Sequence, residues 1–193
     1  MNRHRGARIV LAIFAALALP LAAAAGERAR DEIRPVLPRD TVIGLDAVTR
    51  VFPDVTQEAE TGPNETSIGE PDGSISVVFT SADGTKKVTV SIDRYASVAE
   101  AAAAYESAVQ GSEAAPGFKP SAAPALGEAA FAGTSQVGDE KHFGLGARDG
   151  SLIVSATHAG AIPVTPENSA ALIALGAEEL AVAKRAFGAS SND

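Results

Sequence analysis

Apolar and polar residues alternate most clearly between residues 75 and 92, and this pattern predicts a β-hairpin. Asp83-Gly84 lies at the centre of the alternation, and Asp-Gly is typical of a two-residue turn because both residues tolerate positive φ. Counting outward from that turn gives three apolar cross-strand pairs: Phe79–Val88, Val77–Val90 and Ile75–Ile92. These six side chains are therefore predicted to share one face of the hairpin, with polar residues such as Thr89 on the other.

The next segment has helical spacing. Ser97 and Glu100 form a capping box, which predicts a helix start, and Gly111 is a candidate end. The apolar stripe of this helix consists of Val98, Ala101, Ala102, Tyr105 and Val109. We expect the helix to cover the apolar face of the hairpin.

A second hairpin-plus-helix unit follows. A strand is predicted from about Ala129, with a turn at Gly138-Asp139 that sets Phe131 across from Gly146. A further two-residue turn at Asp149-Gly150 predicts the pairs Arg148–Ser151, Ala147–Leu152, Leu145–Val154 and Phe143–Ala156. The two Asp-Gly turns are 66 residues apart, as in a duplicated unit.

The last predicted helix has clear signals at both ends. Thr165 is the expected N-cap, Pro166 suits the first helical position, and Gly188 ends the helix. One stripe carries Leu172, Leu175, Gly176, Leu180, Ala183 and Phe187, whereas Glu178 and Glu179 are expected mostly off it. Residues 189–193 are expected to fray.

The segment before the first hairpin is less regular. A short helix capped by Asp40 or Thr41 is predicted to end at Pro53. Residues 54–73 are polar and turn-rich, and an extra strand around 67–70 stays open. The acidic stretch 54–72 can be read as a calcium loop or as a solvated loop; it lacks the alternating Asp spacing of a calcium loop, which favours the solvated loop.

Together these elements predict an α+β fold. Two similar hairpin-plus-helix lobes form one antiparallel sheet with the helices packed on one face. The predicted organisation is a signal peptide at 1–25, an extended lead-in at 26–39, a single α+β domain at 40–188 and a frayed tail at 189–193.

The N-terminus predicts export. Three arginines precede an apolar run shorter than the roughly 20 residues of a membrane-spanning helix, and Ala23 and Ala25 suit a signal peptidase. An uncleaved anchor remains the alternative. The chain contains no cysteine, which excludes disulfides, thiol chemistry and a lipid-anchor cysteine.

Cleavage after Ala25 leaves 13 Lys and Arg against 24 Asp and Glu, a formal charge of −11. Such a chain is repelled by phosphate backbones and anionic lipids, so neither nucleic acid nor, after cleavage, a membrane is an expected partner.

The histidines give one candidate site. Alternation places His142 and His158 on opposite faces of the sheet, so no shared metal site is expected. His142 falls with Ser135, Ser155 and Thr157 on one face, which we take as a candidate binding face with His142 at the surface. His158 is expected at the rim of the apolar face.

Three motifs carry a resemblance to a known group: SVAEAAAAY at 97–105, ALGEAAF at 125–131 and GSLIVSA at 150–156 before an Ala-rich helix. The pattern resembles uncharacterised bacterial secreted proteins and lipoproteins, similar to the external sensor domains of bacterial Ser/Thr kinases. Such relatives often carry a cysteine pair and a lipid-anchor cysteine, both missing here. The resemblance implies a sensor-like domain and assigns no catalytic residue.

The sequence therefore leaves two classes of function. A non-catalytic ligand- or protein-binding module is favoured, because no nucleophile elbow, zinc-protease helix or phosphate loop is present. Its partner would be a small molecule or an envelope protein, and no cofactor is expected. The alternative is a small periplasmic hydrolase built from His142 and carboxylates among Glu128, Asp139 and Glu140.

Overall fold

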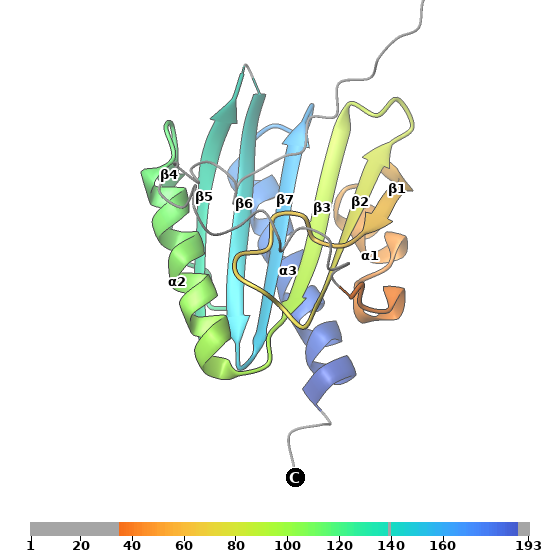
Figure 1. Cartoon of the computed structure of the whole chain (residues 1–193). Coiled ribbons are helices and arrows are strands. Elements are labelled where there is room, and N and C mark those ends of the chain that lie inside the picture. The colour runs from red at the N-terminus through yellow and green to blue at the C-terminus, as the bar shows by residue number, and fades with distance from the viewer. Residues whose placement is uncertain (1–34, 139, 189–193) are drawn as a thin grey trace, which may run out of the picture.

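The computed structural model describes residues 35–138 and 140–188. Its elements in chain order are η1 (Arg39–Thr41), α1 (Leu45–Val51), β1 (Val55–Gly62), β2 (Gly73–Ser81), β3 (Lys86–Arg94), α2 (Val98–Ala114), β4 (Lys119–Pro120), β5 (Ala129–Val137), β6 (Glu140–Asp149), β7 (Leu152–Gly160) and α3 (Pro166–Phe187). The strands form one sheet in the order β1-β2-β3-β7-β6-β5-β4, and each neighbouring pair is antiparallel (Figure 1). The predicted α+β class with an antiparallel sheet is confirmed.

The first hairpin has the predicted register. Phe79 pairs with Val88, Val77 with Val90 and Ile75 with Ile92, and all six side chains are completely buried. The turn hydrogen bond runs from Gly84 N to Ser81 O, and Gly84 has a φ of 72°. The Asp83 carboxylate accepts from Ser81 Oγ and from the amide and hydroxyl of Thr85, which holds its pKa down to about 2.

The second hairpin differs from the prediction by two residues. Its turn centres on Gly150-Ser151, so the pairs are Asp149–Leu152, Ala147–Val154, Leu145–Ala156 and Phe143–His158. A shift of two preserves the face of every side chain, because side chains in a strand alternate with a period of two. The neighbouring β5–β6 pairing sets Phe131 opposite Gly146, as predicted.

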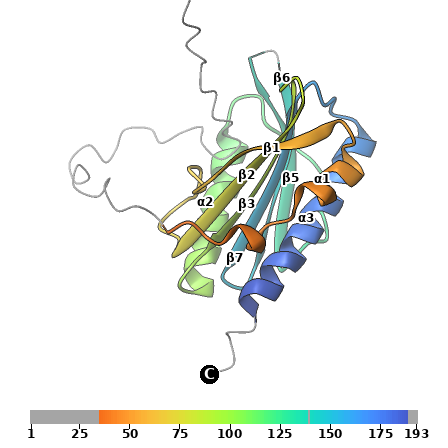
Figure 2. The ribbon, with the colours of Figure 1, turned by 90° about the vertical axis from the view of Figure 1, so that its right-hand side faces the viewer.

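The helices lie on both faces of the sheet, unlike the predicted arrangement on one face. Figure 2 shows α2 on one side of the sheet and α1 with α3 on the other. The apolar face of the first hairpin packs against Leu172, Leu175 and Ala183 of α3 rather than against α2. In contrast, α2 uses Ala101, Ala104 and Tyr105 to cover Ile153 on the opposite face.

The packing explains the glycine in the apolar stripe of α3. A Cβ at Gly176 would approach Leu145 Cδ1 to 2.8 Å, so a glycine lets the helix lie close to the sheet. Both predicted caps form: Thr165 Oγ1 accepts from Asn168 N, and Ser97 Oγ of α2 accepts from Glu100 N. The predicted end of α2 at Gly111 is wrong, because the helix continues to Ala114.

The first part of the described chain departs most from the prediction. Residues 39–41 form only a 3₁₀ turn, and α1 begins at Leu45 with Gly44 as its N-cap. Residues 55–62, expected as loop, form the edge strand β1, whereas 67–70 is not a strand. The lead-in is described from residue 35. Leu37 N donates to Ser74 O of β2, at a part of β2 that β1 does not reach. The predicted signal peptide, most of the lead-in and the predicted frayed tail at 189–193 lie outside the described residues.

Candidate functional site

The four predicted binding-face residues lie on the face of the sheet that carries α2. Ser135 pairs directly with His142 across β5 and β6. Thr157 pairs with Gly144, and Ser155 pairs with Gly146, so both project to the same side as His142. This face therefore carries a polar stripe that runs diagonally over β5, β6 and β7.

The exposure of this stripe differs from the expectation. His142 has an exposed fraction of 0%, so the interpretation of His142 as a surface residue is wrong. Thr157 is also buried, whereas Ser155 is half-buried and lines a groove. An alanine at position 142 would thus leave a cavity, and the small effect expected of a surface site no longer applies.

Ser135 and His142 contain buried polar atoms that lack hydrogen-bond partners among the described residues: Ser135 Oγ and both ring nitrogens of His142. The carboxylate oxygen Oε2 of Glu140 lies 3.8 Å from His142 Nε2. Burial lowers the pKa of His142, and the Glu140 charge opposes this shift. His142 is therefore neutral at pH 7, with one ring nitrogen able to donate and the other able to accept.

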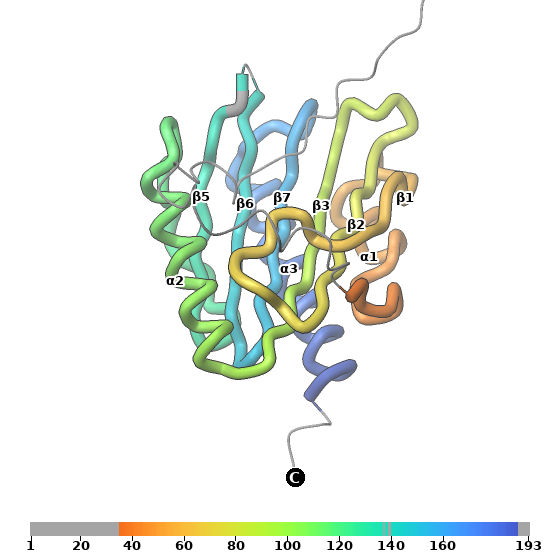
Figure 3. Tube along the Cα trace, in the orientation of Figure 1, coloured from red at the N-terminus to blue at the C-terminus, as the bar shows by residue number. Residues whose placement is uncertain are grey.

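The groove beside Ser155 lies between α2 and the loop 63–72. That loop crosses the same face of the sheet, and its path can be followed in Figure 1 and in the trace of Figure 3. The groove holds about 20 Å³, close to the space of one water molecule. It is lined by Asn64, Thr66, Ile68, Asp93, Tyr95, Ala104, Ala108, Ile153 and Ser155.

The loop 63–72 is tied to the sheet through side chains. Asn64 Nδ2 donates to both carboxylate oxygens of Asp93, at 3.1 and 3.0 Å, and Ser67 Oγ also donates to Asp93. Tyr95 Oη donates to the carbonyl of Ile68 at 2.7 Å. The sequence analysis missed these residues, because Asn64 and Asp93 are 29 positions apart and only the fold brings them together.

The second histidine lies on the other face. His158 is 0% exposed and packs between the rings of Phe52 and Phe143, each with its centroid 5.9 Å away. Burial, followed by the charge of His142, lowers the pKa of His158 to about 4. Placement on opposite faces is confirmed by the register, but the expected rim position of His158 is wrong.

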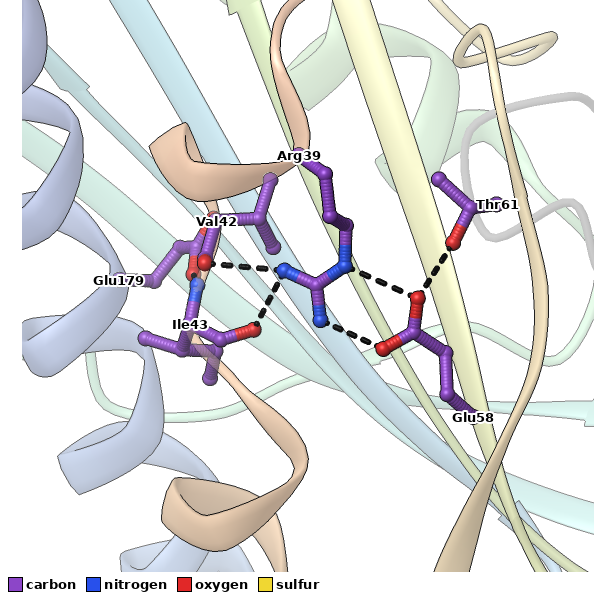
Figure 4. A network of polar contacts seen from close by, with 6 residues as sticks. All are labelled: Arg39, Val42, Ile43, Glu58, Thr61 and Glu179. Atoms are coloured by element: carbon purple, nitrogen blue, oxygen red, sulfur yellow. Dashed lines mark hydrogen bonds and ion pairs between the residues drawn. The ribbon is translucent and has the colours of Figure 1, made fainter.

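A separate polar network, buried at its α3 end and partly exposed at its β1 end, joins α3, η1 and β1, and Figure 4 shows its six residues. Glu179 of α3 is 0% exposed, and its Oε2 accepts from Ile43 N at 2.9 Å. Arg39 donates through Nη1 to the carbonyls of Val42 and Ile43, both at 3.1 Å. Its Nε and Nη2 donate to the Glu58 carboxylate at 2.9 and 2.7 Å, which lowers the pKa of Glu58.

The acidic stretch 54–72 does not converge on a metal position in the part of the chain that the structure describes. There, no three His, Asp or Glu side chains lie close enough together to hold an ion. Glu58 is instead bonded to Arg39 and Thr61, and Asp54 pairs with Lys86.

The carboxylates of the hydrolase alternative are dispersed. Glu140 approaches His142, whereas Glu128 pairs with Arg148 at 2.6 Å. Asp139 lies outside the described residues. No hydrogen bond joins Ser135 to His142 within the described structure, although nucleophilic catalysis by a serine uses such a bond.

No protein-family model and no curated protein matches this chain. A solved structure does match: the extracellular domain of PknH from Mycobacterium tuberculosis, with a TM-score of 0.52 and 7% sequence identity. The alignment covers 78% of this chain and 99% of that domain. The likeness extends to the fold, and it agrees with the resemblance to external kinase domains that the sequence predicted.

None of the described helices is both long and apolar enough to cross a membrane.

Proposed function

We propose that this chain is a non-catalytic, sensor-like binding module that uses the α2 face of its sheet. The observation that carries the proposal is the polar stripe formed by Ser135, His142, Thr157 and Ser155, which ends at the groove beside α2. Buried polar atoms without hydrogen-bond partners are rare in proteins, and a bound polar group or water would satisfy those of Ser135 and His142. The similarity in fold to an extracellular domain supports the sensor-like interpretation.

The proposed ligand is a small molecule that presents hydrogen-bonding groups to the hydroxyls and the neutral imidazole, with an apolar part against Ile153 and Ile68. The groove is smaller than a typical ligand site of several hundred Å³, so binding requires the loop 63–72 to move outward. The hydrogen bonds from Asn64, Ser67 and Tyr95 hold that loop closed in the free protein.

A thermal-shift screen of the mature protein against amino acids, sugars, nucleosides and fatty acids tests this proposal. A ligand that binds only the folded state raises the melting temperature as its concentration exceeds the Kd. Compounds that raise the melting temperature of the wild type should lose their effect on the Ser155→Leu variant, because leucine fills the groove and removes a hydroxyl. They should keep it on the matched Ser107→Leu, which lies on the exposed side of α2.

Equal shifts in both variants would place binding elsewhere, and a screen without hits would contradict a small-molecule ligand of these classes.

A hydrolase remains the second candidate, because the fold sets Ser135 across from His142 with Glu140 nearby. Hydrolysis of p-nitrophenyl butyrate that disappears in both Ser135→Ala and His142→Gln would establish it. We expect no turnover above that of the two variants, since the described structure contains no bond between nucleophile and base.

We further propose that the module acts outside the cytoplasmic membrane after cleavage behind Ala25. Support comes from the predicted signal peptide and from the extracellular neighbour in fold. Intact-mass measurement of the exported protein should find Gly26 at the N-terminus, and Ala25→Arg should retain the leader. An exported wild-type protein that still carries residues 1–25 would contradict this proposal.

A further inference from the structure

Glu179 is a buried carboxylate that the proposed binding face does not use. It belongs to α3, on the face of the sheet opposite the groove. Its Oε2 accepts from Ile43 N, whereas its Oε1 is buried and lacks a hydrogen-bond partner in the described part of the chain. A carboxylate with one unpartnered buried oxygen is destabilised in its charged form.

Residues 39–43, which we call the strap, supply the polar contact to this carboxylate. The strap contains η1 and continues to Ile43, and Thr41, Val42 and Ile43 are all buried. The peptide group between Val42 and Ile43 makes this contact. Its N–H, from Ile43, donates to Glu179 Oε2, and its C=O, from Val42, accepts from Arg39 Nη1. Figure 4 shows Glu179 and Arg39 on either side of this peptide group.

The strap is also tied to the edge of the sheet. Arg39 joins it to Glu58 of β1 through two hydrogen bonds, and this ion pair is partly exposed. An exposed pair of this kind is weaker than buried packing, because water and salt screen it. The strap therefore has one buried polar anchor, at Glu179, and one accessible anchor, at Glu58.

We propose that the strap is a protonation-controlled cover, which is closed over α3 when Glu179 is neutral and opens more readily when Glu179 is ionised. Opening hydrates the carboxylate, so the charged form is favoured in the open state and disfavoured in the closed one. The proposal concerns a device on the α1 and α3 face, and it is independent of the binding face proposed above.

The electrostatics of the closed state agree with this assignment. Burial raises the pKa of Glu179 to about 7, while the Ile43 amide and the Arg39 charge of η1 oppose the shift. The neighbouring charge of Glu178 on α3 raises the pKa further, and Arg50 of α1 pairs with Glu178. In the open state the carboxyl returns towards its ordinary value of 4.5.

Hydrogen exchange of the Ile43 amide tests the proposal, because the hydrogen bond from that amide ends on Glu179. Under conditions where opening is a fast pre-equilibrium, the protection factor of Ile43 should fall roughly tenfold between pH 6 and pH 8, as linkage to a pKa change from 7 to 4.5 requires. Val90, in the centre of the sheet, supplies the reference for global unfolding. Ile43 should be less protected than Val90 throughout.

Two matched variants assign the effect. In Glu179→Gln, the protection factor of Ile43 should change with pH only as much as that of Val90 does. In Glu178→Gln, the roughly tenfold fall in the protection factor of Ile43 should remain. The side-chain carboxyl ¹³C resonance of Glu179 in the wild-type protein should titrate with a midpoint near 7, which needs no variant to fold.

An unchanged protection factor in the wild type, a fall that persists in Glu179→Gln or vanishes in Glu178→Gln, or exchange of Ile43 only together with Val90 would each overturn the proposal. So would a Glu179 resonance that titrates near 4.5.

Discussion

The two faces of the sheet are built from alternate residues of the same strands, yet they differ in the polarity and the burial of their side chains. On the face covered by α1 and α3, the central side chains are apolar and fully buried, among them Ile75, Val77, Phe79, Val88, Val90 and Ile92. On the α2 face the neighbouring positions are mostly polar, and Ser91 Oγ donates to Ser76 Oγ across β2 and β3. One face thus forms the main core, and the other presents polar groups around a groove.

This difference indicates which face dominates stability. Burial of apolar area supplies most of the folding free energy, so the α1 and α3 face is expected to dominate stability. The α2 face buries hydroxyls and a histidine, which contribute less to stability per residue, and it is the face that we propose binds a ligand. Four predictions test this division, in order of decreasing effect.

The largest difference is expected between the two long helices. Leu172→Ala in α3 removes a fully buried side chain and should cost about 2–5 kcal/mol of unfolding free energy, through lost burial and a residual cavity. Val98→Ala in α2, at a side chain that is 54% exposed, should cost below about 0.5 kcal/mol. Urea denaturation at constant m measures both, and equal losses would refute the division between faces.

The second prediction concerns pH. The pKa of Glu179 is raised to about 7, so the folded protein holds this proton where the unfolded chain releases it. The stability that the protonated carboxyl contributes is present below pH 4.5 and is lost as the pH rises through 7. Relative to the wild type, Glu179→Gln should therefore gain about 3 kcal/mol in unfolding free energy between pH 4 and pH 8.

Subtracting the unfolding free energy of the wild type from that of Glu179→Gln cancels the contribution of His158 to the pH dependence, which has the opposite sign. Its lowered pKa of about 4 means that the unfolded chain binds the extra proton, so its contribution rises with pH from about 4 to 6.5. A difference between variant and wild type that stays flat with pH would show that Glu179 ionises freely in the folded protein.

The third prediction compares adjacent residues of β3. Val90→Ala should cost about 1–3 kcal/mol, because Val90 is completely buried on the core face. Thr89→Ala, on the α2 face, should cost less than about 1 kcal/mol, since it loses only local strand preference. Paired urea melts decide the matter, and a reversed order would show that the two faces had been interchanged.

The smallest effect is expected at His142. Its ring is buried, but both nitrogens lack partners among the residues described, so His142→Leu removes polar atoms that contribute no internal bond. Replacing such a group by an apolar one of similar size should change stability by less than about 1 kcal/mol. Thermal and urea melts measure this change. A loss above about 3 kcal/mol in the variant would contradict the prediction, because it would mean that the imidazole is hydrogen-bonded in the folded protein.

Local signals in the sequence predicted part of this fold well. The Asp83-Gly84 register, the Ser97 and Thr165 caps and the stripe on α3 all depend on residues close together in the chain, and the structure confirms them. The polar strand β1 was missed, because Glu58 and its neighbours show no apolar alternation, and the strand forms by pairing with β2. Glu179 was expected on the outer side of α3, yet packing against η1 buries it.

The sequence predicted which residues share the candidate binding face, but it did not predict how far each of them is buried. Alternation correctly put Ser135, His142, Ser155 and Thr157 on one face, and this held even where the hairpin register shifted by two residues. The groove was not predictable, because it needs Asn64 and the loop 63–72 to meet Asp93 and α2 from distant parts of the chain.

Local signals in the chain suffice to predict which residues alternate, where the first hairpin turns and where α2 and α3 begin, because these depend on backbone preferences and period-two geometry within a few residues. The second hairpin turns one residue later than those signals predict. Which face each helix covers, and whether His142 and Glu179 are buried, depends on contacts between distant parts of the chain. That choice depends on the summed packing of α1, α3 and α2 against a sheet that could be covered on either side. Burial then set the charges, since the same carboxyl and imidazole groups would titrate normally in water.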